Sequence, residues 1–290
     1  MFRKLTFLFA AFALTAALAG CGGGGASDEP LRVGLIPNQN PEEVEAQYQP
    51  LEDYLSDEIG REVEVSVPAT YNAVVEALVS GELDMAYFGG LTYVQARQRA
   101  DVSPLVTEVN PNTGTTKYHS LIITPTDSDI SEVEDVEGRD FAFGSVSSTS
   151  GSLYPSIMLD QAGIDYRTDL GEFTYTGGHD TTAQAVANGR VDAGGLEDRI
   201  FYDLRDEGAI DEDSVRIVAE SEPIEGYPWV VRDDLPEEDK EALANAYLNM
   251  EDPELLDLMR AESYERVEAD DYDYTEKQAR ALDLLTEPDQ

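Results

Sequence analysis

Residues 71–84 read YNAVVEALVSGELD, and the same pattern returns at residues 179–192 as HDTTAQAVANGRVD, at a constant offset of 108 residues. In both copies a helix is expected to end at a glycine, after which a tight turn leads into a strand that begins at an aspartate. Such a segment is one helix-to-strand step of an α/β fold. Because it occurs twice, the chain is expected to contain two units built in the same way.

Short apolar segments alternate with amphipathic ones on both sides of each copy. Strands separated by helices are expected at residues 32–36, 63–67, 84–88, 105–109, 118–124, 141–143, 173–175, 191–193, 215–218 and 229–231. This strand–helix–strand order predicts, in each unit, a parallel sheet that is covered by helices on both faces. The last 55 residues are expected to be helical.

The two copies also place Tyr71 and His179 at equivalent positions, at the start of a helix that follows a strand. In open α/β sheets, ligands bind at the carboxyl ends of strands, beside these helix N-termini. Two such units that face each other would enclose a cleft. A lone histidine often has only a structural role, but the two glycines before His179 favour contact with a ligand.

A run of hydroxyl side chains, GSVSSTSGS at residues 144–152, lies between an expected strand and an expected helix. Hydroxyls there can cap the helix, whose first N–H groups and positive dipole end point outward. Several hydroxyls and amides together suit a tetrahedral oxyanion. The simpler alternative is a serine-rich loop with one N-cap. The run lacks the glycine spacing and the lysine of a P-loop, and no G-x-S-x-G nucleophile motif occurs in the chain.

The N-terminus has the features of an export signal. Two basic residues precede a mostly apolar run at residues 5–18, which is too short for a comfortable membrane span. The tetrapeptide LAGC at residues 18–21 resembles a bacterial lipobox, in which Cys21 is lipidated; an ordinary signal peptide with a chance cysteine is the alternative. We therefore expect a signal peptide at residues 1–20 and a lipid-anchored, glycine-rich flexible tether at residues 21–30. Because Cys21 is the only cysteine, the chain has no intramolecular disulfide.

The composition is strongly acidic. Sixty acidic residues face 19 basic ones, which gives a net charge of −41. The acids are dispersed and the aromatic content is ordinary, so we expect a folded protein with an acidic surface rather than a disordered chain. Such a surface favours a halophilic host, because molar salt shortens the Debye length to roughly 3 Å and screens self-repulsion.

Nucleic acid is excluded as a partner because no basic patch would neutralise its phosphates. With two histidines and one cysteine, neither a metal site nor a cofactor is expected.

Three motifs together resemble the phosphate/phosphite/phosphonate-binding proteins of ABC importers, from about Leu31 to about Leu235. They are PATYNAVVEALVSGELDMAYFG at residues 68–89, STSG at residues 148–151 with Tyr154-Pro155 after it, and Gly178-His179-Asp180. The resemblance implies an α/β fold of the type II periplasmic-binding class, in which two lobes enclose a ligand cleft and are joined by two crossing strands. It implies a discontinuous lobe 1 at residues 31–123 and 222–290, and a lobe 2 at residues 124–221.

The resemblance also implies roles for single residues. The side chains expected to hold the phosphorus oxygens are Tyr71, Tyr118, Ser148, Thr149, Ser150 and His179. Phosphonate-binding members of the family also hold an amino group of the ligand with two carboxylates. Here one position carries Arg199, with Glu197 two residues away, and the other carries Tyr227. Glu197 and Tyr227 stay among the candidate site residues, but the departure favours phosphite, phosphate or a small alkylphosphonate over 2-aminoethylphosphonate.

We therefore expect a monomeric, lipid-anchored solute-binding protein outside the cytoplasm, which captures a small phosphorus oxyanion by hinge closure and docks on ABC permease subunits. It is not expected to be an enzyme. Two alternatives stay open. One is a binding protein of the same fold for another small ligand, in which alanine at Ser148 and Thr149 would leave binding intact. The other is a hydrolase that uses Ser148 or Ser150 with His179, which would turn over a phosphate ester.

Overall fold

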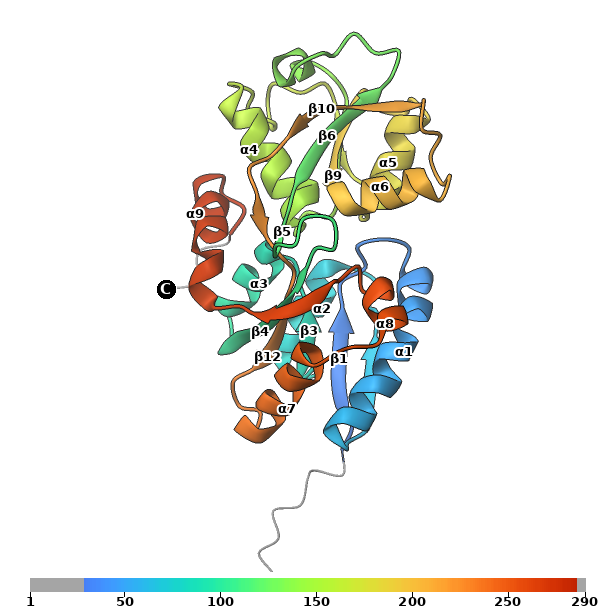
Figure 1. Cartoon of the computed structure of the whole chain (residues 1–290). Helices are drawn as coiled ribbons and strands as arrows, with labels where there is room; N and C mark the ends of the chain where they lie inside the picture. The colour runs from blue at the N-terminus through green and yellow to red at the C-terminus, as the bar shows by residue number, and fades with distance from the viewer. Residues whose placement is uncertain (1–28, 286–290) are drawn as a thin grey trace, which may run out of the picture.

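The chain folds into two α/β lobes, one above the other (Figure 1). The computed structural model describes residues 29–285, so the predicted signal peptide, the predicted lipidation site Cys21 and most of the predicted tether lie outside it. Lobe 1 is built on a six-stranded sheet and lobe 2 on a five-stranded sheet. Over residues 29–285, none of the helices has both the length and the apolar character that a membrane span requires.

Lobe 1 has the strand order β13-β4-β12-β3-β1-β2. Its strands are β1 (Leu31–Leu35), β2 (Val63–Ser66), β3 (Met85–Tyr87), β4 (Val102–Val109), β12 (Pro228–Arg232) and β13 (Ser263–Arg266). Its helices are α1 (Pro41–Ile59), α2 (Tyr71–Ser80), α3 (Gly90–Arg97), α7 (Glu237–Leu248), α8 (Pro253–Leu258) and α9 (Asp273–Ala281), with the short turn η3 (Ala269–Tyr272) before α9. Helices α1, α7 and α8 pack together on one face of the sheet, and α2, α3 and α9 on the other.

Lobe 2 has the strand order β10-β6-β9-β7-β8. Its strands are β6 (Ser120–Pro125), β7 (Phe141–Phe143), β8 (Phe173–Tyr175), β9 (Ala193–Glu197) and β10 (Val215–Glu220). Its helical elements are η1 (Val133–Val136), the π-helical turn η2 (Thr149–Leu153), α4 (Tyr154–Gln161), α5 (His179–Ala187) and α6 (Asp198–Asp206). Side chains alternate along β6, so Leu121 and Ile123 join the core under α5 and α6, whereas Ile122 joins the core under α4. Both faces of this sheet are therefore covered, as the sequence predicts.

A short antiparallel ribbon joins the lobes. Strand β5 (Lys117–Tyr118) leads from lobe 1 into β6, and β11 (Ile224–Glu225) leads from β10 back to β12; the two pair with each other. These are the two crossing strands that the family resemblance implies. The hydrophobic core of lobe 1 also takes in Leu153, Tyr154 and Ile157 of lobe 2, so the lobes are packed against each other.

The helix starts that the sequence repeat predicts are confirmed in both copies, although the strands begin after the aspartates, at Met85 and Ala193. Tyr71 is the first residue of α2 and His179 is the first residue of α5. Helix α2 starts where it does because the Thr70 hydroxyl accepts the backbone N–H of Ala73. Gly81 follows α2 in the left-handed conformation, with a φ of 82°, which a glycine adopts without strain.

The prediction of purely parallel sheets is wrong. Strands β1, β2 and β3 are parallel, as expected. Strand β12, however, runs antiparallel to its neighbours β3 and β4, because it brings the chain back from lobe 2. In lobe 2, β6 brings the chain in from lobe 1 and is likewise antiparallel to β9. Sheets that share crossing strands are therefore mixed, although the strand–helix rhythm of each half is that of a parallel sheet.

Two smaller predictions are also wrong. The last 55 residues are not all helical, because β13 pairs with β4 at the edge of the sheet. With four residues, β13 is too short to show a strand period in the sequence. The strand predicted at residues 118–124 is interrupted at His119, where β5 in the ribbon ends and β6 in lobe 2 begins.

Candidate functional site

The structure brings all eight predicted site residues to the junction of the two lobes and the ribbon. Tyr71 opens α2, and Tyr227 directly precedes β12, both in lobe 1; Tyr118 lies on β5 of the ribbon. Lobe 2 contributes Ser148, Thr149 and Ser150 at the start of η2, His179 at the start of α5, and Glu197 at the end of β9. Each of these side chains is at most 2% exposed, so the lobes are closed over them.

The three hydroxyls at residues 148–150 have three different environments. The Ser148 hydroxyl caps η2 by accepting the N–H of Gly151 at 2.9 Å. The Thr149 hydroxyl accepts the N–H of Leu91 at 2.9 Å, which ties η2 to the start of α3 in the other lobe. The Ser150 hydroxyl is buried and has no hydrogen-bond partner within residues 29–285. Only the first of these is an ordinary N-cap, so the simple capped loop does not account for the run.

Two further buried polar atoms near Ser150 have no hydrogen-bond partner among the described residues, the Tyr118 hydroxyl and Nε2 of His179. The hydroxyls of Tyr118 and Ser150 are close enough for Ser150 to lower the tyrosine's pKa, although burial raises that pKa far more. The ring of His179 lies against Gly151, next to Ser150. Because a buried polar group without a partner is costly, three neighbouring ones indicate a binding site. We call Tyr118, Ser150 and His179, with Tyr71, Ser148 and Thr149 around them, the cradle.

His179 is set up to donate a hydrogen bond into the cradle. The backbone N–H of Glu197 donates to Nδ1 of His179 at 3.3 Å, which makes Nδ1 the acceptor and leaves the proton on Nε2. Burial lowers the pKa of His179, and this effect outweighs the nearby carboxylates of Glu197 and Asp180, which raise it. The imidazole is therefore neutral, with its Nε2–H aimed away from Glu197.

The tyrosines at the site are also hydrogen-bond donors. Burial, followed by the charge of Glu197, raises the pKa of Tyr71, Tyr118 and Tyr227 above the ordinary value. Each phenol therefore keeps its proton at neutral pH. Hydrogen-bond donors without formal charge suit an anion, because they stabilise its oxygens and do not themselves require a buried counter-ion.

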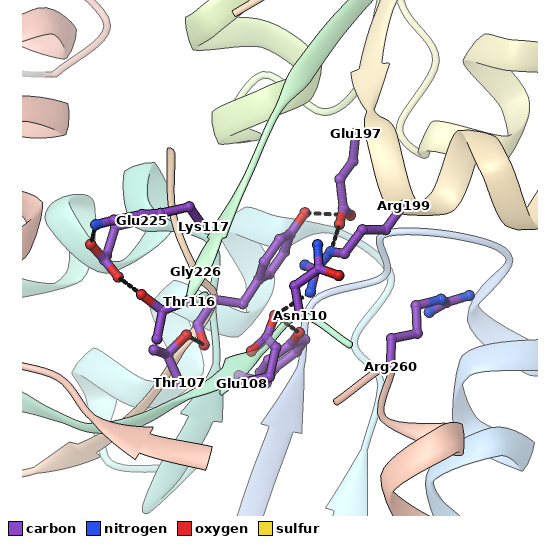
Figure 2. Close-up of polar contacts among 12 residues, drawn as sticks. Thr107, Glu108, Asn110, Thr116, Lys117, Glu197, Arg199, Glu225, Gly226 and Arg260 are labelled. Atoms are coloured by element: carbon purple, nitrogen blue, oxygen red, sulfur yellow. Dashed lines mark hydrogen bonds and ion pairs between the residues drawn. The ribbon is translucent and has the colours of Figure 1, made fainter. Parts of the chain in front are cut away.

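A buried ion-pair cluster adjoins the cradle at Glu197, whose backbone N–H donates to His179. Figure 2 shows this cluster. Arg199 donates from Nε to Glu197 at 2.5 Å and from a terminal nitrogen to Glu108 of β4 at 2.9 Å. The Tyr227 hydroxyl donates to the other oxygen of Glu197 at 3.0 Å. Burial raises the pKa of Glu197, but the positive charge of Arg199, with Arg260 nearby, brings it below the ordinary value. Glu197 is thus ionised and already fully engaged by the protein.

Several hydrogen bonds cross between the lobes and hold the closed form. The Ser147 hydroxyl donates to the Asn72 side chain at 2.5 Å. The N–H of His179 donates to the carbonyl of Asn38 at 2.9 Å. Arg260, in the turn after α8, binds Asp203 on α6. In Figure 1 α9 runs beside the junction of the lobes, and it contacts both α3 and η2.

Replacing Gly151 by alanine is expected to damage the cradle directly. An added Cβ would lie 2.8 Å from the Ser148 hydroxyl and 3.1 Å from both the Gly144 backbone and the His179 ring. Overpacking of this kind costs about 1–3 kcal/mol, so calorimetry should show ligand affinity reduced by about tenfold or more. Gly60→Ala is the control, because its positive φ of 65° costs stability while no atom lies near the new Cβ. Equal affinity losses in both variants would contradict the placement of Gly151.

Replacing Asp203 by asparagine is expected to weaken the closed form without touching the cradle. The pair that Asp203 makes with Arg260 is partly exposed, so about a two- to fivefold faster ligand release is expected at low salt. Stopped-flow measurements of the dissociation rate would test this. The difference should shrink at molar salt, where the pair is screened. An effect that is the same at all salt concentrations would mean that Asp203 does not act through this ion pair.

Two α/β lobes joined by two crossing strands and closed over a buried set of polar side chains define a solute-binding protein of the type II periplasmic class. The sequence model of the family described as "ABC transporter, phosphonate, periplasmic substrate-binding protein" matches residues 33–272. The chain belongs to this family of phosphonate ABC-transporter substrate-binding proteins, which act outside the cytoplasm and which bind rather than catalyse.

Known relatives support the same assignment. The chain is 30% identical to the "Phosphate-import protein PhnD" of Mycolicibacterium smegmatis, over 71% of this chain and 67% of that protein. It is 26% identical to a probable ABC transporter phosphite-binding protein of Prochlorococcus marinus, over 88% and 90% of the two chains. A solved structure of a protein from the same organism, in complex with methylphosphonate, superposes with a TM-score of 0.80 at 26% identity and covers 88% of this chain and 98% of its own.

Sequence reasoning missed Glu108 and saw Arg199 only as a mismatch. The two residues are 91 positions apart and meet only because β4 and α6 face each other in the closed form. A usable signal exists for Glu108, since it is a charged residue inside the strand expected at residues 105–109, in a sheet expected to be covered by helices on both faces. A buried carboxylate seldom lacks a partner, so Glu108 in this strand predicts a cationic side chain next to it.

Proposed function

We propose that this protein captures a small phosphorus oxyanion without an amino group, namely phosphite, phosphate or methylphosphonate, and presents it to an ABC permease. The observation that carries the proposal is the cradle, in which Tyr118, Ser150 and His179 have buried polar atoms with no partner among the described residues. Neutral donors from hydroxyls and one imidazole fit a tetrahedral anion. The relatives that import phosphate or bind phosphite and methylphosphonate support the choice of phosphorus.

Hinge closure is the proposed mechanism of capture. The ribbon of β5 and β11 is the narrow connection between the lobes, and Tyr118 on this ribbon is part of the cradle. A ligand bound to η2 and α5 of lobe 2 would draw in Tyr71 of lobe 1. The hydrogen bonds from Leu91 to Thr149 and from His179 to Asn38 would then form across the lobes. The closed form, monomeric and with its ligand enclosed, is what would dock on the permease.

The same geometry argues against a hydrolase. A serine nucleophile needs a histidine base whose second nitrogen is oriented by an acceptor, as in a Ser-His-Asp triad. Here Nδ1 of His179 accepts the backbone N–H of Glu197 instead of donating to a carboxylate. The Ser148 hydroxyl is engaged with the N–H of Gly151. Neither Ser148 nor Ser150 therefore has an oriented general base.

Titration calorimetry with phosphite, phosphate and methylphosphonate, with sulfate as the control anion, would test the proposed function. At least one phosphorus oxyanion is expected to bind at micromolar concentration or below, both at low and at molar salt, since buried hydrogen bonds are screened little. At 100 times its Kd a ligand also raises the unfolding free energy by roughly 2.7 kcal/mol, which thermal unfolding detects. If sulfate alone binds, or none of the four does, the ligand class is wrong.

We also propose that Cys21 carries a lipid that holds the protein at the outer side of the membrane, since residues 18–21 resemble a lipobox. Cys21→Ser should then move the protein from the membrane fraction to the soluble fraction of cells. An unchanged distribution would favour an ordinary signal peptide.

A high-salt habitat is the proposed reason for the net charge of −41. Because screening relieves the repulsion between the acids, the unfolding temperature is expected to rise between about 0.1 and 2 M KCl. An unfolding temperature that stays constant or falls as the KCl concentration rises would contradict this explanation of the charge.

A further inference from the structure

Arg199 is an unusual residue to find next to an anion-binding cradle. Its side chain is 9% exposed, and it is the second residue of α6, where the positive end of the helix dipole disfavours a cation. Two carboxylates compensate for this, Glu197 at 2.5 Å and Glu108 at 2.9 Å, both buried. The guanidinium also lies over the rings of Tyr118 and Tyr227, at 5.2 and 5.5 Å from their centroids.

Two buried carboxylates and two aromatic faces form a binding site for a cation, and its occupant is a side chain of the same protein. We call Glu108, Glu197, Tyr118 and Tyr227 the cation cage. Figure 2 shows Arg199 pointing from the lobe 2 side toward Glu108, with Glu197 beside it.

The cation cage and the cradle share their walls. The backbone N–H of Glu197 donates to Nδ1 of His179, whose Nε2 belongs to the cradle. Tyr118 belongs to both, because its ring contacts the Arg199 guanidinium while its hydroxyl lies near Ser150. A ligand with an anionic head in the cradle would therefore place a short amine-bearing tail in the cation cage, if Arg199 were absent.

We propose that Arg199 acts as a built-in cation that fills this cage and thereby restricts the protein to phosphorus oxyanions without a cationic group. The inference rests on the proposed function, because the cradle must hold the phosphorus head group before the cation cage can discriminate between tails with and without a cationic group. Arg199 would act in two ways. It occupies the space that an ammonium group would need, and it neutralises Glu197, which would otherwise repel an anion bound beside His179.

Removal of Arg199 is expected to invert the ligand preference. In Arg199→Ala, methylphosphonate should bind at least tenfold more weakly than in the unchanged protein, and 2-aminoethylphosphonate at least tenfold more tightly. Calorimetry with both ligands on the full mature chain gives the two numbers. Arg205→Ala is the matched control, since Arg205 lies on the same helix and over the ring of Tyr202, but away from the cage. It should leave both affinities unchanged.

Three further measurements distinguish the effect of charge in the cation cage from the effect of the space that Arg199 leaves. They also distinguish both effects from misfolding of the Arg199→Ala variant. Arg199→Ala/Glu197→Gln keeps the space but loses the carboxylate that directly adjoins the cradle through His179, so it should not gain affinity for the amine. Arg199→Ala/Glu108→Gln relieves the buried charge if the single variant fails to fold, and it should still prefer the amine. Guanidinium ion, far below denaturing concentrations, should restore methylphosphonate binding to Arg199→Ala, because a surface hollow lined by Asn110, Asp203 and Arg260 reaches Arg199.

The outcomes are distinguishable. Suppose that the unchanged protein binds methylphosphonate, but that neither Arg199→Ala nor Arg199→Ala/Glu108→Gln gains affinity for 2-aminoethylphosphonate in its folded form. The inference is then overturned and the proposed function stands. If the unchanged protein binds no phosphorus oxyanion yet Arg199→Ala binds the amine, the cage is supported and the ligand class of the native site is wrong. If no variant binds either ligand, both are overturned.

Discussion

Replacing His179 by alanine is expected to weaken binding of methylphosphonate or phosphite by about 100-fold or more. The change removes the Nε2–H donor, and a hydrogen bond to a charged group contributes about 1.5–3 kcal/mol. It also leaves the buried N–H of Glu197 without its acceptor, which adds a cost to the closed form. Each 1.4 kcal/mol is about a factor of ten in Kd, so calorimetry resolves the loss easily.

His179→Gln is the matched variant, because its amide can place an N–H near the position of Nε2 but has no acceptor atom at the position of Nδ1, where the N–H of Glu197 donates. Its affinity is expected to lie between those of the alanine variant and the unchanged protein. A merely structural histidine would behave differently: the unfolding temperature without ligand would fall in both variants, and affinity would not follow the donor. A Kd in His179→Ala within about threefold of the original would remove His179 from the site.

The fold was predictable wherever a local pattern repeats, and not where the chain returns from far away. The repeat located the starts of α2 and α5, because a glycine stop, a turn and a strand leave a short-range signature. The antiparallel course of β12 has no such signature. Its direction depends on a crossing that begins more than a hundred residues earlier, at β5. The same is true of β13. It pairs with β4, although all of lobe 2 lies between these two strands in the sequence.

The candidate site shows the same division. The hydroxyl run and His179 stand out in the sequence because loops between strands and helices are natural anion sites and histidine is rare in this chain. The partners of Arg199 do not stand out. Glu108 is one of sixty acids, and in so acidic a chain a carboxylate near any given arginine is expected by chance. Only the burial of the three side chains separates this cluster from the surface ion pairs.

Replacing Trp229 by alanine is expected to lower the free energy of unfolding by roughly 3–5 kcal/mol, which corresponds to about 10 °C in unfolding temperature. Trp229 is completely buried in β12, between β3 and β4 of the central sheet of lobe 1. Its ring centroid lies 4.8 Å from those of both Tyr87 and Tyr247. Alanine would leave a cavity that neighbouring strands cannot close without breaking their pairing. Thermal and urea unfolding would measure the loss.

The effect should reach the site, because Trp229 belongs to a row of rings that ends there. Tyr87 stacks on Tyr227 at 5.4 Å, and Tyr227 contacts Tyr118 at 5.1 Å, so the core of lobe 1 supports two walls of the cation cage. Trp229→Phe keeps an aromatic face toward Tyr87 and should retain affinity with a smaller loss of stability. If Trp229→Ala is destabilised while binding methylphosphonate as tightly as the unchanged protein, the row of rings serves the core alone and Tyr227 is held by its bond to Glu197.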